Sequence, residues 1–140
     1  MRLMGESASH IRLVEQMSAW ILRNHLNDDH GYMLIDHPSS SPTARPPKIA
    51  GFVPDIYVPR ARSHGIIIAE AKTARDLETR HTLNQIEAFL GRCTQAEEAI
   101  LILAVPWDMV RLGEAIIRQI RKGLKDENRV TTKVLEKLSG

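Results

Sequence analysis

Two short apolar segments, separated by an amphipathic stretch, constrain the fold of this chain more than any other feature. Residues 65–72 begin with three consecutive isoleucines after a glycine, and residues 99–105 are apolar throughout. Continuous apolar strands are typical of a sheet that is covered on both faces. Between them, residues 77–90 carry leucine and isoleucine at helical spacing, with Gly91 as the expected C-terminal cap. The order strand, helix, strand therefore predicts a parallel pair joined by a right-handed crossover.

Further segments extend this unit to a mixed α/β domain. The expected additional elements are an amphipathic helix over 7–26, strands over 32–36 and 52–58, and a helix over 108–122. Pro54 marks the start of its strand or a bulge, because proline cannot donate a ladder hydrogen bond. Residues 37–51 hold four of the seven prolines and form a long loop, which we expect to be mobile or functional. Residues 126–140 fit either a helix or a strand, so we expect one α/β domain with a small mixed sheet flanked by helices.

Composition and charge narrow the class of protein. The 140 residues correspond to one domain, and 19 Lys and Arg against 17 Asp and Glu give a net charge of +2. This balance excludes a histone-like polycation but leaves a phosphate-binding partner open. The longest apolar run has seven residues, too short to cross a bilayer, and no signal peptide can be recognised. We therefore expect a soluble, cytoplasmic protein with no membrane partner.

Cysteine and histidine usage argues against a zinc site. Cys93 is the only cysteine, which excludes an intrachain disulfide and a cysteine-rich metal site. The six histidines show no ligand spacing. Asp28, Asp29 and His30 lie in an Asn-Asp-Asp-His-Gly string, which we interpret as a turn rather than as a metal site.

The residues most informative about chemistry lie on the two strands before the expected helix. Pro54-Asp55 is followed, after fourteen intervening residues, by Glu70-Ala71-Lys72. Residues i and i+2 of a strand share a face, so Glu70 and Lys72 project together while Ala71 faces the core. If the two strands pair, Asp55 meets Glu70, and two carboxylates this close need a cation or a proton between them. Oxygen ligands favour Mg²⁺ or Mn²⁺, and a lysine beside such a cation suits hydrolysis of a phosphodiester.

This pattern resembles the PD-(D/E)xK nuclease superfamily, whose restriction-endonuclease-like fold has an αβββαβ core. The expected order of elements over residues 10–105 is similar to that core. The resemblance implies that Asp55, Glu70 and the Ala71 carbonyl bind Mg²⁺, with Mn²⁺ as an alternative. It also implies that Lys72 serves the attacking water. The size and the motif look most like compact stand-alone members, such as Holliday-junction resolvases and VRR-type nuclease domains.

The resemblance implies further catalytic and nucleic-acid-binding residues. Many members place a glutamate on the N-terminal helix, and some place a glutamine on the helix after the lysine strand; Glu15 and Gln85 match these positions. Basic residues that flank the motif are candidate phosphate contacts: Lys48, Arg60, Arg75 and Arg80. A member of this size without a separate recognition domain is expected to act as a homodimer, because cutting two strands requires two sites.

Several of these residues also have a plain structural interpretation. Glu70 and Lys72 can form an exposed ion pair, which contributes little to stability, and Glu15 can simply face solvent. The segment 111–133 has seven basic residues against three acidic ones, a local charge of +4. That charge is typical of the polar face of an amphipathic helix, and also of a surface that follows a phosphate backbone.

The sequence therefore predicts a metal-dependent DNA endonuclease that recognises the structure of its substrate rather than a base sequence. No phosphate loop, dinucleotide fingerprint or serine-hydrolase elbow competes with this interpretation. The alternative is a catalytically inactive nucleic-acid-binding or assembly module on the same fold. A third hypothesis, an interaction protein without a nucleic-acid role, requires the motif to be a coincidence.

Overall fold

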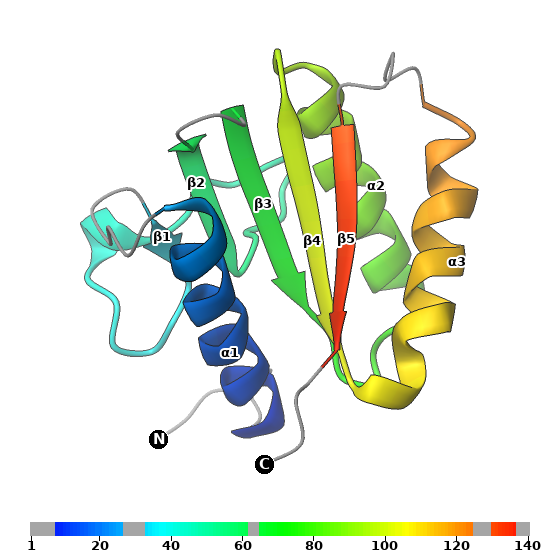
Figure 1. Ribbon diagram of the computed structural model, residues 1–140, viewed down its shortest axis with the longest axis horizontal. Coiled ribbons are helices and arrows are strands. Elements are labelled where there is room, and N and C mark those ends of the chain that lie inside the picture. Colours follow the sequence, from blue (N-terminus) through cyan, green and yellow to red (C-terminus); the bar gives the residue numbers. More distant parts are fainter. Residues whose placement is uncertain (1–7, 27–32, 62–64, 125–129, 137–140) are drawn as a thin grey trace.

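A five-stranded mixed sheet forms the centre of the computed structural model, which describes residues 8–26, 33–61, 65–124 and 130–136 (Figure 1). Helices surround this sheet, and the class is α/β, as the sequence predicts. In chain order the elements are α1 (Ala8–His25), β1 (Leu34–Ile35), η2 (Pro42–Ala44), β2 (Ile56–Ala61), β3 (Gly65–Ala71), α2 (Arg80–Thr94), β4 (Ala99–Val105), η3 (Trp107–Met109), α3 (Val110–Arg121) and β5 (Val130–Glu136).

The strands lie side by side in the order β1-β2-β3-β4-β5. β1, β2 and β3 pair antiparallel, whereas β3, β4 and β5 pair parallel. α2 connects β3 to β4, and α3 lies between β4 and β5 in the chain, since neighbouring parallel strands need a crossover connection. The parallel strand–helix–strand unit predicted over residues 65–105 is therefore confirmed.

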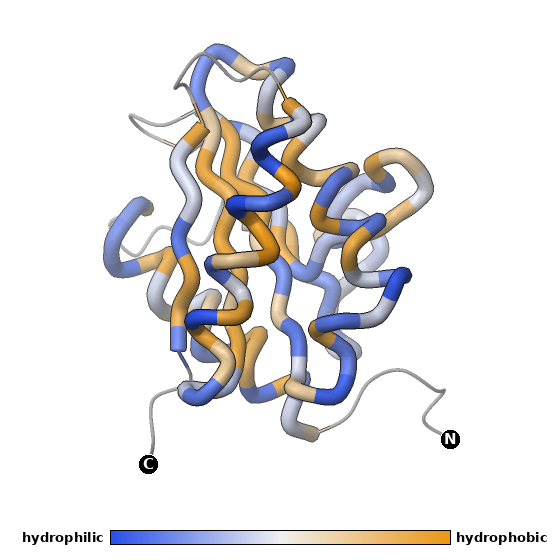
Figure 2. Tube along the Cα trace, turned by 90° about the vertical axis from the view of Figure 1, so that its right-hand side faces the viewer, coloured by the Kyte–Doolittle hydropathy of each residue, from blue (hydrophilic) through white to orange (hydrophobic). Residues whose placement is uncertain are grey.

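Helices cover both faces of the sheet. α1 packs on one face, while α2 and α3 pack on the other (Figure 1). In β3, Ile67 and Ala69 belong to the core under α1, whereas Ile66 and Ile68 belong to the core under α2 and α3. The central strands are coloured as hydrophobic along most of their length (Figure 2). The continuous apolar strands are thus explained by cover on both faces.

β2 begins later than the sequence predicts. Its first residue is Ile56, and the predicted positions up to Pro54 lie outside it. Pro54 has no N–H to donate, and the Asp55 N–H bonds to the Glu70 side chain instead of to the backbone of a neighbouring strand. Of the two residues, Asp55 contributes only its carbonyl, which accepts from the Asp36 N–H at 2.8 Å. β2 also extends beyond the predicted end at residue 58, so Arg60 lies within the strand.

α2 is displaced toward the C-terminus relative to the predicted helix 77–90. Thr79 caps its first turn by accepting a hydrogen bond from the Thr82 N–H, so the helix begins at Arg80. The helix then continues past Gly91. Gly91 is therefore a residue of the helix interior and not its cap.

The N-terminal helix confirms the predicted amphipathic pattern, with one difference. Ile11, an apolar residue near the start of the helix, is only partly buried. The buried residues of α1 are Leu13, Val14, Met17, Ile21 and Leu22. These side chains pack on the sheet face that includes Ile67 and Ala69 of β3.

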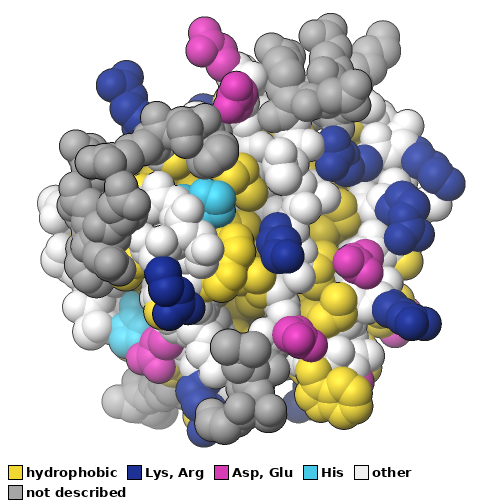
Figure 3. Space-filling model, viewed as in Figure 1, with side chains coloured by type: hydrophobic (Ala, Val, Ile, Leu, Met, Phe, Trp, Pro, Cys, Tyr) yellow, Lys and Arg dark blue, Asp and Glu magenta, His cyan; other side chains and the backbone are white. Residues whose placement is uncertain are grey.

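The C-terminal part of the chain forms α3 and β5. α3 begins at Val110, after the 3₁₀ turn η3, so it starts slightly later than predicted. Ile117 is buried whereas Arg111 and Arg118 are exposed, and Lys and Arg side chains gather over α3 on the right of Figure 3. The basic residues within α3 lie on the polar face of an amphipathic helix, whereas Lys133 lies in β5. The segment that fitted either a helix or a strand contains β5.

The loop between β1 and β2 is partly ordered by local bonds. It contains η2 and a two-residue bridge between Ile49 and Phe52. The turn predicted around Asp28, Asp29 and His30 lies outside the described residues. Among the helices that are described, none combines the length and the apolar character needed to cross a membrane.

Candidate active site

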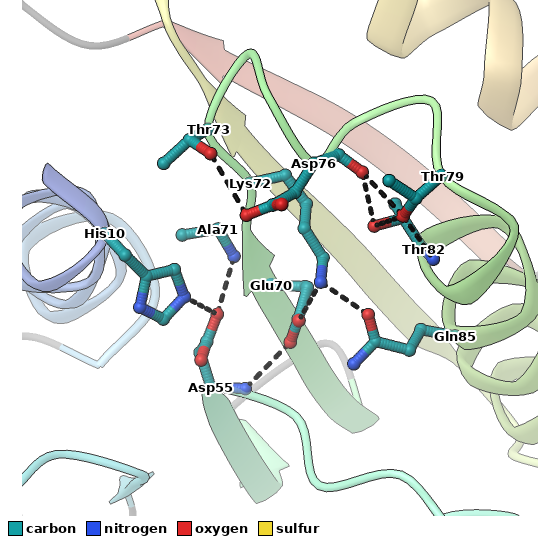
Figure 4. Close-up of polar contacts among 10 residues, drawn as sticks. All are labelled: His10, Asp55, Glu70, Ala71, Lys72, Thr73, Asp76, Thr79, Thr82 and Gln85. Carbon is teal, nitrogen blue, oxygen red and sulfur yellow. Dashed lines mark hydrogen bonds and ion pairs between the residues drawn. The ribbon is translucent and has the colours of Figure 1, made fainter. Parts of the chain in front are cut away.

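A cluster of buried polar side chains lies where β3 ends and β2 begins (Figure 4). Asp55, the residue before β2, donates its N–H to Glu70 Oε1 at 3.0 Å. Asp55 Oδ2 in turn accepts from the Ala71 N–H at 2.8 Å. Asp55 and Glu70 are each only 4% exposed. The predicted meeting of Asp55 and Glu70 across the two strands is therefore confirmed.

Lys72 joins the cluster from the position just after β3. Its Nζ lies 3.2 Å from Glu70 Oε2 and donates to Gln85 Oε1 of α2 at 2.5 Å. The Lys72 N–H donates to the Ala104 carbonyl at 2.9 Å, which continues the pairing with β4 and holds the Lys72 backbone in place. Ala71 is fully buried in the core under α1. The predicted alternation of side chains is confirmed, and the ion pair is buried rather than exposed.

α1 contributes a histidine that the sequence prediction missed. His10 Nε2 lies 3.1 Å from Asp55 Oδ2, the same oxygen that accepts from the Ala71 N–H. His10 precedes Val14 and Met17 by about one and two helical turns, so these residues share the face that packs on the sheet. That spacing is the signal by which the sequence could have identified His10.

The structure does not bring Glu15 into this cluster. Its side chain is 59% exposed, and its Oε2 lies 3.4 Å from His37 Nε2. Glu15 follows His10 by five residues, which turns it about 140° away around the helix axis. The carboxylate therefore faces the segment after β1 rather than Asp55.

The four basic candidates also lie outside the cluster. They are all exposed: Lys48, Arg60, Arg75 and Arg80. Arg60 lies five residues beyond Asp55 along an extended chain, about 16 Å at 3.3 Å per residue. Arg75 and Arg80 flank the turn between β3 and α2. Within the described ranges, none of the four makes a hydrogen bond or ion pair with a cluster residue.

Hydrogen bonds in the turn between β3 and α2 hold Gln85 in position. Thr82 Oγ1 and Thr79 Oγ1 donate to the Asp76 carbonyl at 2.7 Å and 2.9 Å. Thr73 Oγ1 donates to the Asp76 carboxylate at 3.1 Å (Figure 4). Thr82 is fully buried and precedes Gln85 by about one turn, so these bonds set where Gln85 meets the end of β3.

The surroundings of Glu70 disfavour the charged form of its carboxyl group. Burial raises the pKa of Glu70 well above its ordinary value of 4.5, and the negative charge of Asp55 raises it further. The Lys72 ammonium and the hydrogen bond from the Asp55 N–H lower it in part. Among these three side chains the acids outnumber the ammonium, so the cluster favours the uptake of a proton or a cation.

The donor atoms of the cluster suit a hard divalent cation. The described residues contain no group of three or more His, Cys, Asp and Glu side chains that could hold a metal ion. Mg²⁺, however, needs only one or two carboxylates, because waters and substrate phosphates complete its coordination. Both contacts to the Asp55 carboxylate use Oδ2, so Oδ1 has no hydrogen-bond partner among the described residues. The excess negative charge and the oxygen donors therefore fit Mg²⁺ or Mn²⁺.

Comparison with known proteins does not assign this chain to a family. The chain matches no protein-family model, no curated protein and no solved structure. The chemistry of the cluster is therefore inferred from its own residues.

Proposed function

We propose that this chain is a metal-dependent nuclease that hydrolyses phosphodiester bonds of DNA. One observation supports this most strongly: two buried carboxylates, one just before β2 and one in β3, meet a buried lysine. Glu70 accepts from the Asp55 N–H at 3.0 Å and lies 3.2 Å from Lys72 Nζ. Buried charges of this kind are costly to folding, and they cluster at functional sites.

The residues that would hold the cation are Asp55, Glu70 and the Ala71 carbonyl. When bound, Mg²⁺ or Mn²⁺ supplies Lewis-acid stabilisation of phosphate charge and eases the deprotonation of water. The raised pKa of Glu70 supports this choice, because a divalent cation would offset the repulsion between the two carboxylates.

The chain's own residues supply the remaining functions. Lys72 Nζ has three donor protons and two partners among the described residues, so one proton can reach the scissile phosphate or the attacking water. Gln85 accepts from Nζ at 2.5 Å and thereby orients it. His10 and the Ala71 N–H hold one oxygen of Asp55 in place.

The proposal includes a restriction-endonuclease-like fold of the PD-(D/E)xK type. In its support, α1, β1, β2, β3, α2 and β4 follow one another in the αβββαβ order. Among the described elements none is a separate base-reading module, which favours a substrate recognised by its structure. A homodimer is part of the proposal, because two strands require two sites.

Cleavage assays test the proposed activity directly. Supercoiled plasmid and branched or nicked DNA are incubated with Mg²⁺, Mn²⁺ or EDTA. Asp55→Asn, Glu70→Gln and Lys72→Met each keep the shape of the side chain and remove its charge. Each is expected to slow cleavage by about 10²–10³-fold, since the lost charge acts on the reacting phosphate. Glu97→Gln makes the same chemical change at an exposed residue and is expected to keep the wild-type rate.

The outcome also separates the two functions predicted for this fold. Cleavage that persists in EDTA, or at the wild-type rate in all three variants, contradicts the proposal. If the wild type never cleaves DNA but binds it in a salt-sensitive way, the chain is instead an inactive nucleic-acid-binding or assembly module.

A further inference from the structure

A groove lies between the segment 47–50 and the outer side of α2. It has a volume of about 520 Å³. We call it the α2 groove; the lining residues that matter for its chemistry are Lys48, Tyr57, Gly91, Arg92 and Gln95. It is distinct from the buried cluster around Asp55 and Glu70, because neither carboxylate lines it.

The α2 groove is positively charged. Lys48 is exposed and Arg92 is partly exposed, and both line the groove. Among the described residues that line it, none is acidic. Neither Lys48 nor Arg92 takes part in an ion pair within the described ranges. An anionic ligand in the groove would therefore meet two cations whose charge is not offset by an acidic partner.

Gly91 leaves the floor of the groove open. It lies inside α2, where glycine costs about 1 kcal/mol of stability relative to alanine. A β-carbon built at Gly91 would meet no atom within 4 Å, so close packing does not explain the glycine. The space above this helix turn is instead available to a ligand that approaches the helix closely.

A tight turn holds Lys48 at the edge of the groove. Ile49 and Phe52 exchange backbone hydrogen bonds of 2.6 Å and 2.9 Å. Between them, Ala50 and Gly51 both have positive φ angles, 51° and 88°, as a two-residue turn of this kind requires. Ile49 is 8% exposed and belongs to the core under α2, so it anchors the backbone next to Lys48.

The α2 groove lies farther along α2 than the point where this helix meets the buried cluster. Gln85 of α2 contacts Lys72, and Arg92 follows Gln85 by seven residues, about 10 Å along the helix. Tyr57, on the other wall, lies two residues beyond Asp55. At 3.4 Å per nucleotide, 10 Å corresponds to about three nucleotides of a strand.

From these observations we infer that the α2 groove binds the phosphate backbone of the DNA strand on one side of the cleaved bond. This inference rests on the proposed nuclease function, because it assigns the groove to the same substrate. Lys48 and Arg92 pair with phosphates, and Gly91 lets the strand lie close to α2. The groove thus extends the site from one phosphodiester to a short segment of strand.

The test measures DNA binding in EDTA, where metal-dependent cleavage is absent, as a function of salt. Fluorescein-labelled branched DNA is titrated with protein at several salt concentrations. Lys48→Ala and Arg92→Ala are each expected to reduce the slope of log affinity against log salt by about one. Gly91→Glu places a like charge against the backbone and is expected to weaken binding by about tenfold or more.

Two matched controls accompany these variants. Gly91→Ala adds one methyl group that meets no protein atom, so it is expected to raise the melting temperature by a few degrees. Because the methyl group enters the groove, Gly91→Ala is expected to weaken DNA binding, but less than Gly91→Glu does. Arg118→Ala removes an exposed cation from α3, outside the groove, and is expected to leave the salt slope unchanged. Wild-type affinity and slope in folded Lys48→Ala and Gly91→Glu would overturn the inference. An equal loss of slope in Arg118→Ala would also overturn it.

A second substrate separates this inference from the proposed function. Bis(p-nitrophenyl) phosphate is a small diester that does not extend into the groove. Gly91→Glu is expected to lose activity on DNA by a much larger factor than on this diester in Mn²⁺, whereas Arg118→Ala keeps the wild-type rate on both. A wild type that hydrolyses neither substrate refutes the proposed function, and the binding data then still decide whether the groove holds DNA.

Discussion

Glu70 is the residue at which burial and charge conflict most strongly. Its carboxylate is buried, a second carboxylate lies close by, and one lysine offsets only part of the repulsion. Asp55 contributes both the N–H that stabilises Glu70 and the charge that destabilises it. This conflict has no benefit for folding, which is why we connect it with cation binding.

The raised pKa of Glu70 predicts an unusual dependence of stability on pH in metal-free protein. Because the folded-state pKa exceeds the ordinary value of 4.5, the folded protein binds this proton more tightly than the unfolded chain does. The resulting stabilisation is fully present below pH 4.5 and is lost as pH rises through the folded-state pKa. Denaturant unfolding in EDTA should therefore show that Glu70→Gln gains stability relative to wild type as pH increases. Parallel curves for the two proteins would contradict this prediction.

His10 is predicted to act through Asp55. With Asp55 ionised, the His10 ring nitrogen donates to Oδ2 at 3.1 Å and restricts the carboxylate to one orientation. His10→Ala should lower the DNA cleavage rate and the Mn²⁺ affinity by about 10–100-fold, as for other residues that orient a metal ligand. His10→Gln can still donate a hydrogen bond from its amide, so it should recover much of the cleavage rate and of the Mn²⁺ affinity. His81→Ala, a matched change at an exposed histidine, should leave the rate and the affinity unchanged. Single-turnover kinetics measure the cleavage rate, and calorimetry measures the Mn²⁺ affinity. Equal values for His10→Ala and wild type would show that His10 does not orient Asp55.

At the scale of elements, the strands were predictable because burial on both faces leaves a simple sequence pattern. The apolar runs that become β3 and β4 needed no knowledge of their neighbours. The spacing of Asp55, Glu70 and Lys72 likewise follows from strand pairing and alternation alone. The fold class and the central residues of the candidate site could therefore both be predicted from the sequence.

Other features depended on contacts that the sequence does not specify. The start of α2 is decided by bonds from Thr79 and Thr82 to the Asp76 carbonyl, which compete with helix formation before residue 80. The choice of His10 over Glu15 required knowing which helix face touches the sheet. β5 was ambiguous because only one of its seven residues is buried, so its apolar pattern is weak.

The connection into β3 depends on a glycine. Gly65 has a φ of 69°, and a β-carbon there would collide with the backbone carbonyl oxygen of Glu98. That carbonyl accepts from the Ile66 N–H at 3.2 Å, so it cannot move freely. Gly65→Ala should therefore destabilise the protein by about 2–5 kcal/mol, from the left-handed backbone and the collision together. Chemical denaturation measures the loss, with Gly91→Ala as a glycine control that should gain stability, and an unchanged Gly65→Ala would contradict the prediction.

At the scale of the whole molecule, a small net charge conceals an uneven distribution. The chain carries +2 overall. Among the described residues, the two buried acids Asp55 and Glu70 lie at one end of β3, while exposed or partly exposed cations occupy α3 and the α2 groove. A divalent cation at Asp55 and Glu70 would make the site end of the sheet more positive than the composition indicates. Near-neutral composition is therefore compatible with a substrate as negative as DNA.

The most direct test of the central claim is the single-turnover cleavage rate of labelled branched DNA as a function of Mg²⁺ concentration. The wild type should show no cleavage in EDTA and a rate that saturates with Mg²⁺. Glu70→Gln, which keeps the side-chain shape and removes one ligand charge, should need far more Mg²⁺ or fail to cleave. A wild-type rate independent of Mg²⁺, or a Glu70→Gln curve that coincides with wild type, would contradict a shared cation at Asp55 and Glu70.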